Sequence, residues 1–378
     1  MLRTSHILIP ISDWFWNWKE EQSLAHEFMN APLEDESVEN AWFDQYVLAS
    51  VNVFNKEGIF NFLSRTGWQD VSTVAETLQY DEEALFRTAL VVNTRGILDV
   101  DVENRRIQIA KNAEDVWASY GQFSKVLLLD KVLPDGSMAP SSYYELRVQT
   151  MLRTGSSAAG TRIGSFSDSW RKGFVDPLAA KSYNEFMRCQ SLPVAIASAK
   201  KGIFSNSKRV VDLGGASASF SMAIKASDPE IECIVLDLPE MCEDCERYLS
   251  NYEELSVSIH AASFLENDWG IEADSFILCN ILHDWSLHDC IHILETANKH
   301  MHGSGRLFIV ERLLDENGLG PKNAVVFHML MYMNHASGQL KLSEINRMLE
   351  ETGFSQAQSI FTFNGYNIIT ANSVRLEC

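Results

Sequence analysis

The second half of the chain alternates short apolar runs with stretches whose apolar residues recur at helical spacing. Strands are predicted for KRVVDLGG, IECIVLDLP, LSVSIHAASF, DSFILCNILHDW and GRLFIVERLL, with helices between them. Alternating strands and helices indicate a parallel, doubly wound sheet. The last two apolar segments, AQSIFTF and YNIITANS, flank Asn364-Gly365, which is a strong signal for an antiparallel hairpin. Residues 201–378 are therefore predicted to form an α/β domain whose parallel sheet ends in a hairpin.

The first half has a different, mainly helical pattern. Within residues 38–133, a series of helical patterns precedes two short β segments, ILDVD and RRIQIA, around the turn residues Glu103 and Asn104. This order is typical of a winged-helix domain, and we interpret it as a dimerisation or scaffold module. Residues 1–37 form an N-terminal extension. Residues 134–200 begin with a stretch rich in Gly, Ser and Thr, and we expect them to connect the two halves or to cover a substrate.

Composition and charge exclude several classes of protein. The 31 basic and 51 acidic residues give a net charge of −20, which argues against a nucleic-acid or anionic-membrane surface. The 7 cysteines lack the spacing of a disulfide framework, which indicates a reducing compartment. The first residues do not resemble a signal peptide, and no apolar run is long enough to span a membrane. We therefore expect a cytoplasmic protein with neither a nucleic-acid nor a membrane partner.

Polar and glycine residues follow the first two predicted strands of the α/β half. The first strand ends in Asp212, Gly214 and Gly215, and the second ends in Asp237. In doubly wound sheets, ligands bind at the carboxyl ends of the strands, where glycines allow a tight turn and a close approach of the backbone. A carboxylate at the second strand end can accept both hydroxyls of a ribose. The pattern indicates a nucleotide-like ligand, although Asp237 could also be a helix N-cap ahead of Pro239.

The fourth predicted strand ends in ILHDW, which places His283 at the same edge of the sheet. A neutral imidazole with an ordinary pKa of about 6.5 is suited to accept a proton near neutrality. His283 is therefore a candidate general base. The alternative is a histidine that only packs at the end of its strand.

Together these motifs resemble the S-adenosylmethionine-dependent small-molecule O-methyltransferases, which include plant caffeic-acid-type and bacterial polyketide-tailoring enzymes. The resemblance covers roughly residues 40–375 and is carried by VVDLGG, VLDLPE, ILHDW, IVERLL and LSEINRMLEETGF before the terminal hairpin. It implies a Rossmann-like class I methyltransferase domain, S-adenosyl-L-methionine as the methyl donor, and a homodimer formed through the N-terminal domain. It also implies methyl transfer to a hydroxyl of an aromatic or polyketide-like natural product.

The resemblance implies roles for individual residues, which fall into three groups. The catalytic group would be the base His283 with Asp284 and Glu311, of which Glu311 orients the imidazole. The donor would be lined by Asp212, Gly214, Gly215, Asp237, Leu238, Ser263, Phe264 and Trp285. The acceptor pocket would include Met187, His328 and Met331.

Several positions depart from the family pattern. Ala216, Ser217 and Ala218 follow the two glycines where further glycines are usual, and each adds a Cβ. Ser263 stands where an acidic residue usually contacts the adenine side of the donor, and Lys341 stands near the position of a usual glutamate. These changes are expected to weaken donor binding or to accompany a change of reaction.

Three other functions therefore stay open. His283 and His328 could share one cavity and hold a metal in a C-methyltransferase, although two histidines are an incomplete ligand set. The fold could have been repurposed for a reaction without methyl transfer, such as a cyclisation. The winged helix could bind DNA in a regulator, which the acidity disfavours. We expect no metal.

Two further motifs are expected to be structural. His288 and His292 are spaced i, i+4 on the helix after ILHDW and are expected at its surface. Cys242 and Cys245 form a CxxC pattern without a second pair, so we expect neither a zinc site nor a redox pair.

Overall fold

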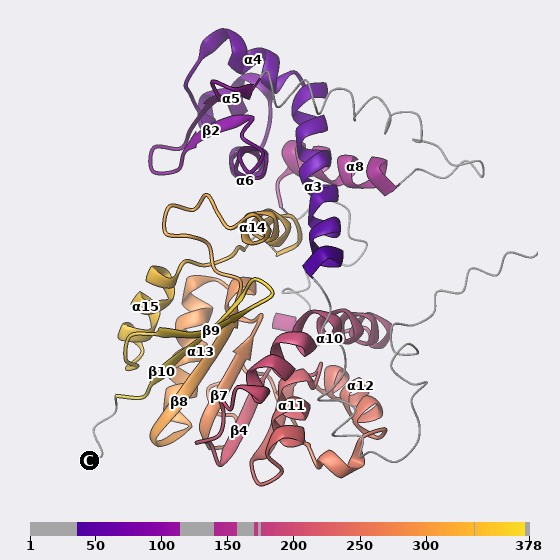
Figure 1. Ribbon diagram of the computed structural model, residues 1–378, viewed down its shortest axis with the longest axis vertical. Coiled ribbons are helices and arrows are strands. Elements are labelled where there is room, and N and C mark those ends of the chain that lie inside the picture. The colour runs from indigo at the N-terminus through magenta and orange to yellow at the C-terminus, as the bar shows by residue number, and fades with distance from the viewer. Residues whose placement is uncertain (1–35, 114–139, 157–169, 173–174, 336, 375–378) are drawn as a thin grey trace, which may run out of the picture.

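The computed structural model describes residues 36–113, 140–156, 170–172, 175–335 and 337–374. Figure 1 shows a mainly helical N-terminal part stacked on an α/β part, with helix α14 between them. None of the helices in these ranges is long and apolar enough to cross a membrane.

The N-terminal part has the order of elements predicted from the sequence. Its elements are α3 (Glu36–Lys56), α4 (Ile59–Thr66), β1 (Gln69–Asp70), α5 (Val71–Leu78), α6 (Glu82–Asn93), β2 (Leu98–Asp101) and β3 (Arg106–Ile109). The strands form an antiparallel sheet in the order β1-β3-β2. Asp81 begins α6, because its carboxylate accepts a hydrogen bond from the backbone N–H of Ala84 at 2.8 Å.

The hydrophobic core of the N-terminal part includes two helices from elsewhere in the chain. Helix α8 (Pro140–Thr154) contributes Val148 and Leu152, and helix α14 (Lys322–His335) contributes Val326 and Met329. The predicted boundaries at 133 and 200 therefore separate segments that pack into one core. Because α14 follows strand β8 (Met301–Glu311) of the α/β part, its burial in this core connects the two parts of the molecule.

The α/β part is built on a seven-stranded sheet in the order β6-β5-β4-β7-β8-β10-β9. Its strands are β4 (Arg209–Leu213), β5 (Glu232–Asp237), β6 (Ser258–Ala261), β7 (Ala273–Cys279), β8 (Met301–Glu311), β9 (Gln358–Phe363) and β10 (Tyr366–Asn372). β4 to β8 pair in parallel, whereas β10 is antiparallel to both β8 and β9. The hairpin turn is at Asn364 and Gly365, with φ of 48° and 74°. The predicted parallel sheet with a terminal hairpin is confirmed.

Helices cover both faces of this sheet. Helices α10 (Pro177–Lys200), α11 (Ser219–Ser227) and α12 (Pro239–Leu249) pack on one face, and α13 (Leu287–Lys299) and α15 (Leu342–Glu351) on the other. Alternate strand residues supply the two interfaces, as in β4, where Val210 packs on one face and Val211 on the other. Because helices cover both faces of the sheet, only the ends of the parallel strands can contact a ligand. The candidate site lies at the carboxyl ends of β4, β5, β7 and β8.

Candidate active site

The turn after β4 requires glycine at two successive positions. Gly214 has φ of 67°, and a Cβ there would lie 2.5 Å from Cδ1 of Ile281. A Cβ on Gly215 would lie 2.3 Å from Cγ of Asp212. The turn brings the backbone N–H of Ala216 toward Oδ2 of Asp237, at 3.2 Å. The two glycines thus hold the ends of β4 and β5 close together.

Two buried carboxylates lie at this turn. Burial raises the pKa of Asp212 to about 7, although the hydroxyl of Ser221 donates a hydrogen bond to Oδ2 at 3.2 Å. Burial also raises the pKa of Asp237 to about 6, against hydrogen bonds from the backbone N–H groups of Leu238 and Ala216. Perturbed carboxylates that line a cavity are typical of functional sites.

A cavity at the edge of the sheet, hereafter the sheet-edge cavity, occupies about 760 Å³ including its open part. All eight residues predicted to line a methyl donor are in its wall: Asp212, Gly214, Gly215, Asp237, Leu238, Ser263, Phe264 and Trp285. The rings of Phe264 and Trp285 meet edge to face, with centroids 5.6 Å apart. The cavity therefore combines carboxylates, exposed backbone and aromatic faces.

His283 lies in a short 3₁₀ turn, η2 (Leu282–Asp284), directly after β7. Its Nδ1 is 2.5 Å from Oε2 of Glu311, which ends the neighbouring strand β8. Its Nε2 is 3.5 Å from Oδ1 of Asp284. Since the carboxylate of Glu311 accepts the proton on Nδ1, the lone pair of the neutral ring is on Nε2. The structure thus brings together the three residues predicted to be catalytic.

The surroundings of His283 make it more basic. Burial lowers its pKa, but the charges of Glu311 and Asp284 and the hydrogen bond to Glu311 outweigh burial and raise the pKa to about 9. The ring is therefore a stronger proton acceptor than an exposed histidine.

A second cavity lies between α10, α14 and the N-terminal helix α3, and we call it the helix-side cavity. It occupies about 1350 Å³ including its open part, and His283 lines it together with the predicted pocket residues Met187 and Met331. Tyr183, Met187, Asn280 and Asp284 line both cavities. The two cavities therefore meet beside His283, which lines only the second.

Three residues at this junction were not singled out from the sequence. Asn280 directly follows β7 with φ of 56°, and its Nδ2 donates to the hydroxyl of Tyr366 at 3.1 Å. Tyr183 is half-buried, and burial of its hydroxyl and the charges of Asp284 and Asp237 raise its pKa well above its ordinary value. Asn280 could have been found, because an asparagine at a strand end readily adopts positive φ. Tyr183 and Tyr366 leave no such signal.

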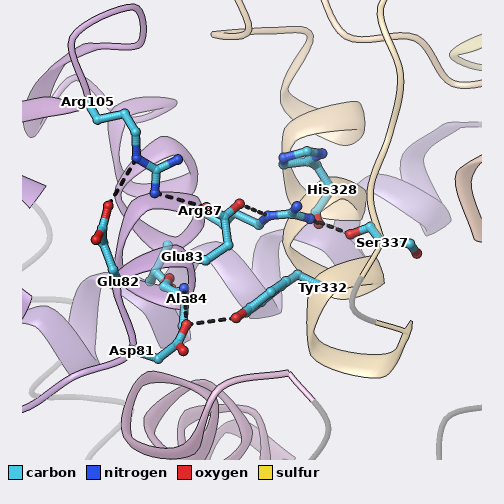
Figure 2. A network of polar contacts seen from close by, with 10 residues as sticks. Asp81, Glu82, Glu83, Ala84, Arg87, Arg105, His328, Tyr332 and Ser337 are labelled. Carbon is cyan, nitrogen blue, oxygen red and sulfur yellow. Dashed lines mark hydrogen bonds and ion pairs between the residues drawn. The ribbon is translucent and has the colours of Figure 1, made fainter. Parts of the chain in front are cut away.

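Figure 2 shows His328 on α14 beside Arg87 of the N-terminal part. Its carbonyl accepts a hydrogen bond from Arg87 at 2.9 Å, and the same guanidinium nitrogen bonds to the carbonyl of Ser337 at 2.5 Å. Burial and the charge of Arg87 lower the pKa of His328 to about 3. Since His328 lines neither cavity, the expectation that it faces the acceptor with His283 is corrected. Within the described ranges, no three His, Cys, Asp or Glu side chains gather as metal ligands would.

The other histidine and cysteine motifs have structural surroundings. His288 is exposed, and Nε2 of His292 lies 3.0 Å from the carbonyl of Leu265. Cys242 and Cys245 are buried, and burial raises the pKa of the Cys242 thiol to about 12. These thiols are therefore protonated near neutrality and poor nucleophiles.

A family model of the O-methyltransferase domain matches residues 162–355, which is just over half of the 378 residues. The chain belongs to this O-methyltransferase family. The resemblance inferred from VVDLGG, VLDLPE and ILHDW is thereby confirmed. The match covers the sheet-edge cavity and the turn that carries His283.

Curated relatives of this family match part of the chain. Acetylserotonin O-methyltransferase from Bos taurus is 28% identical over 162 residues, which are 43% of this chain and 47% of the relative. Myricetin 7/4'-O-methyltransferase 2 from Solanum habrochaites is 27% identical over 215 residues, which are 54% of this chain and 56% of the relative. The matched region thus spans about half the length of these curated relatives.

Solved structures share the whole fold. An O-methyltransferase family 2 protein from Planctomyces limnophilus, crystallised with apigenin, superposes with a TM-score of 0.61 at 16% identity, covering 94% of this chain and 98% of that chain. Human N-acetylserotonin methyltransferase in complex with SAM gives a TM-score of 0.50 at 18% identity, covering 94% and 99%. At these identities the similarity shows the fold alone, which is that of the class I methyltransferases.

Ala216, Ser217 and Ala218, which follow the two glycines of the turn after β4, lead to a prediction about stability. Ala218 precedes α11 with φ of 58°, a conformation that costs a non-glycine residue about 1–2 kcal/mol. Ala218→Gly is expected to raise the free energy of unfolding by roughly 0.5–1 kcal/mol, since part of the relief is lost to the flexibility of glycine in the unfolded chain. Urea denaturation of the two proteins measures the difference.

Ala216→Gly is the matched control, because Ala216 lies two residues away and does not have positive φ. That substitution is expected to lower the stability. If both variants lost stability equally, the strain assigned to Ala218 would be refuted.

The pKa of His283 also determines how stability depends on pH. The folded-state pKa of about 9 lies above the ordinary value of 6.5. Folding therefore favours the protonated ring, and this contribution is fully present below about pH 6.5 and is lost as the pH rises through about 9. We expect the melting temperature of the wild type to fall across this range, and that of His283→Gln to change less. Parallel pH profiles of the two proteins would contradict the assignment.

Proposed function

We propose that this protein is an S-adenosyl-L-methionine-dependent methyltransferase that acts on a hydroxyl of an aromatic or polyketide-like acceptor. The observation that carries the proposal is the junction of two cavities beside His283, with the predicted donor-lining residues on one side and apolar walls on the other. A donor in the sheet-edge cavity and an acceptor in the helix-side cavity would meet at Asn280 and Asp284.

The residues of the sheet-edge cavity fit the methyl donor. The carboxylate of Asp237 is buried at the end of β5, where it would accept the ribose hydroxyls. Phe264 and Trp285 offer aromatic faces to the adenine or the sulfonium. Gly214 and Gly215 lie in the wall of the cavity, where their missing side chains allow the tight turn after β4. When bound, S-adenosyl-L-methionine supplies an electrophilic methyl group.

His283 would act as the general base for the acceptor. Its Nε2 takes the hydroxyl proton, while Nδ1–H stays hydrogen-bonded to Glu311 at 2.5 Å and the carboxylate stabilises the imidazolium that forms. A phenolic hydroxyl has an ordinary pKa of about 10. The pKa of about 9 for His283 is close to this value, so the proton transfer is nearly balanced.

The walls of the helix-side cavity favour an aromatic acceptor. They include Trp42, Phe186, Phe327, Leu330 and Met331. The ring of Phe327 lies 6.2 Å from the ring of His283, and so an aromatic acceptor packed on Phe327 would hold its hydroxyl near the base.

Calorimetry with S-adenosyl-L-methionine, followed by turnover with a panel of phenols and hydroxyquinones, tests the proposal. We expect stoichiometric donor binding and release of S-adenosylhomocysteine with an O-methylated product. A methyl group on carbon would indicate the C-methyltransferase alternative. Donor binding without methyl transfer to any acceptor, or no donor binding, would contradict the proposed function.

The proposal also includes a homodimer formed through the N-terminal part, as the family resemblance implies. Light scattering of the full chain would test it, with twice the chain mass of 42.6 kDa as the expected result.

A further inference from the structure

Arg147 is a cation in the wall of the helix-side cavity. It lies on α8 and is half-buried. One terminal nitrogen donates to the hydroxyl of Tyr46 at 2.8 Å, and the other donates to Oδ1 of Asn334 at 2.7 Å. Both acceptors are neutral. The guanidinium has five N–H donors and is always protonated, so these bonds leave donors and a full positive charge.

Other arginines in this region bind carboxylates. Arg153, on the same helix, forms an ion pair with Glu57, and Arg87 forms one with Glu83. Among the described residues, no carboxylate lies within ion-pair distance of Arg147, whose polar partners are Tyr46 and Asn334. The rings of Tyr46 and Tyr143, whose centroids lie 6.0 and 5.8 Å from the guanidinium carbon, add cation–π contacts but no negative charge. The described part of the chain thus gives this cavity-lining cation no anion, and a ligand can supply one.

The two carboxylates that line this cavity are bound elsewhere. Asp176 is the N-cap of α10 and accepts hydrogen bonds from the backbone N–H groups of Leu178 and Ala179 at 3.0 and 3.1 Å. Asp284 lies 3.5 Å from Nε2 of His283.

A row of aromatic rings joins the two polar ends of the cavity. The centroid of Phe327 lies 6.2 Å from that of His283 and 6.2 Å from that of Trp42. Trp42 in turn lies 5.7 Å from Tyr46, whose hydroxyl accepts the hydrogen bond from Arg147. An extended, flat molecule would thus contact aromatic side chains between a base at one end and a guanidinium at the other.

We propose that Arg147 binds a carboxylate on the acceptor, so that the substrate is an extended hydroxylated aromatic acid whose hydroxyl faces His283. This inference rests on the proposed function, because it places the acceptor in the helix-side cavity. Arg147 determines specificity and takes no part in proton transfer. The geometry of a guanidinium matches a carboxylate in two parallel hydrogen bonds.

The test compares two probes of the same shape that differ in charge, 6-hydroxy-2-naphthoic acid and 6-hydroxy-2-naphthamide. Binding is measured by calorimetry with and without S-adenosyl-L-methionine, and methylation is measured separately. The wild type is expected to bind the acid at least 10-fold more tightly than the amide. Arg147→Met is expected to weaken acid binding by roughly 10- to 100-fold and amide binding little, since a hydrogen bond to a charged group is worth this much.

Two further variants control for structure and charge. Arg147→Lys keeps the charge without the planar fork and is expected to retain part of the preference for the acid. Arg153→Met removes a cation from the same helix outside the cavity and is expected to leave the acid-to-amide ratio unchanged.

The outcomes separate this inference from the proposed function. Three outcomes would overturn the role of Arg147. The wild type could bind acid and amide equally, or it could fail to bind the acid. Arg147→Met and Arg147→Lys could also lose affinity for both probes to the same extent. Preference for the acid that depends on Arg147, without methylation of any acceptor, would support this inference while refuting the proposed function. Methylation of both probes at equal efficiency would support the proposed function while refuting the role of Arg147.

Discussion

Replacing His283 with glutamine is expected to lower kcat by roughly 10²- to 10⁴-fold, the usual contribution of a positioned general base. Glutamine fills similar space and its amide can donate to Glu311, but it cannot accept a phenolic proton. The affinity for S-adenosyl-L-methionine is expected to stay unchanged, because His283 does not line the sheet-edge cavity. Steady-state kinetics and calorimetry on the same preparations measure both quantities.

The dependence of the rate on pH separates a base from a structural histidine. The neutral ring is the active form, so the wild-type rate is expected to rise with pH until it levels near the His283 pKa of about 9. In His283→Gln the levelling near pH 9 is expected to be absent, and the low residual rate is expected to keep rising with the phenolate fraction up to the acceptor's own pKa of about 10. A structural role would lower the rate at every pH and leave the shape of the profile unchanged.

A matched control comes from another buried histidine of the same part. His300 stacks on Trp269, and its Nε2 lies 3.4 Å from Asp268, outside both cavities. His300→Gln is expected to retain wild-type kcat. His283→Ala is the less informative change, because it leaves the buried carboxylate of Glu311 without its partner and destabilises the fold. Full activity in His283→Gln would refute the assignment of the base.

Replacing Asp237 with asparagine is expected to raise the Kd for S-adenosyl-L-methionine roughly 100-fold or more, because two hydrogen bonds to a charged group are weakened. The amide oxygen can still accept from the N–H of Leu238, which bonds Oδ1 at 2.8 Å, whereas the longer bond of 3.2 Å from the N–H of Ala216 to Oδ2 is lost because an amide nitrogen cannot accept it. The glycines of the turn after β4 are unchanged, so the turn is expected to persist. Calorimetry measures the loss. In the wild type, donor affinity is also expected to fall as the pH drops below about 6, where the carboxyl of Asp237 becomes protonated.

The same substitution is expected to stabilise the protein without the donor. The pKa of Asp237 is about 6 in the folded chain, above the ordinary value of 3.8. Its favourable contribution to folding is therefore fully present below about pH 4 and is lost as the pH rises through about 6, so the ionised group lowers stability near neutrality. Asparagine carries no charge, and the melting temperature of Asp237→Asn is expected to exceed that of the wild type at pH 7.5.

The control for Asp237 is an aspartate at the opposite end of the sheet. Asp274 accepts hydrogen bonds from the backbone N–H groups of Lys208 and Arg209 at 2.9 and 3.1 Å and lines neither cavity. Asp274→Asn is expected to leave the Kd for the donor unchanged. Tight donor binding by Asp237→Asn would refute the assignment of the Asp237 carboxylate to the donor site.

The residues at the strand ends were predictable because the topology leaves them only one place. Parallel strands end at one edge of a sheet, so a motif at the end of β4, β5 or β7 reaches the same cavity whatever the details of packing. This is why the eight residues expected to line the donor share one cavity, and why His283 lies beside Glu311. Their roles in binding and catalysis stay predictions until the variants are measured.

The helix-side cavity was less predictable, because segments distant in the sequence pack together to form it. Helix α14 reads KNAVVFHMLMYMNH and is apolar on most of its circumference, so the sequence does not indicate which face lines the cavity. The structure packs it between two parts of the chain, with Phe327 and Met331 toward His283 and with His328 and Tyr332 toward Arg87. Arg147 reaches the same cavity only because α8 packs against α3.

The sequence by itself determined the α/β fold, the terminal hairpin, the glycine turn and the pairing of His283 with Glu311. Period-two and helical spacing, turn residues and strand order are local or topological properties, and each is encoded within a short segment. The tertiary structure decided which side chains form the helix-side cavity, that His328 is not among them, and that Arg147 is. Those outcomes depend on how α3, α8, α10 and α14 pack together, and packing of apolar surfaces is not directional enough to be read from any one of them.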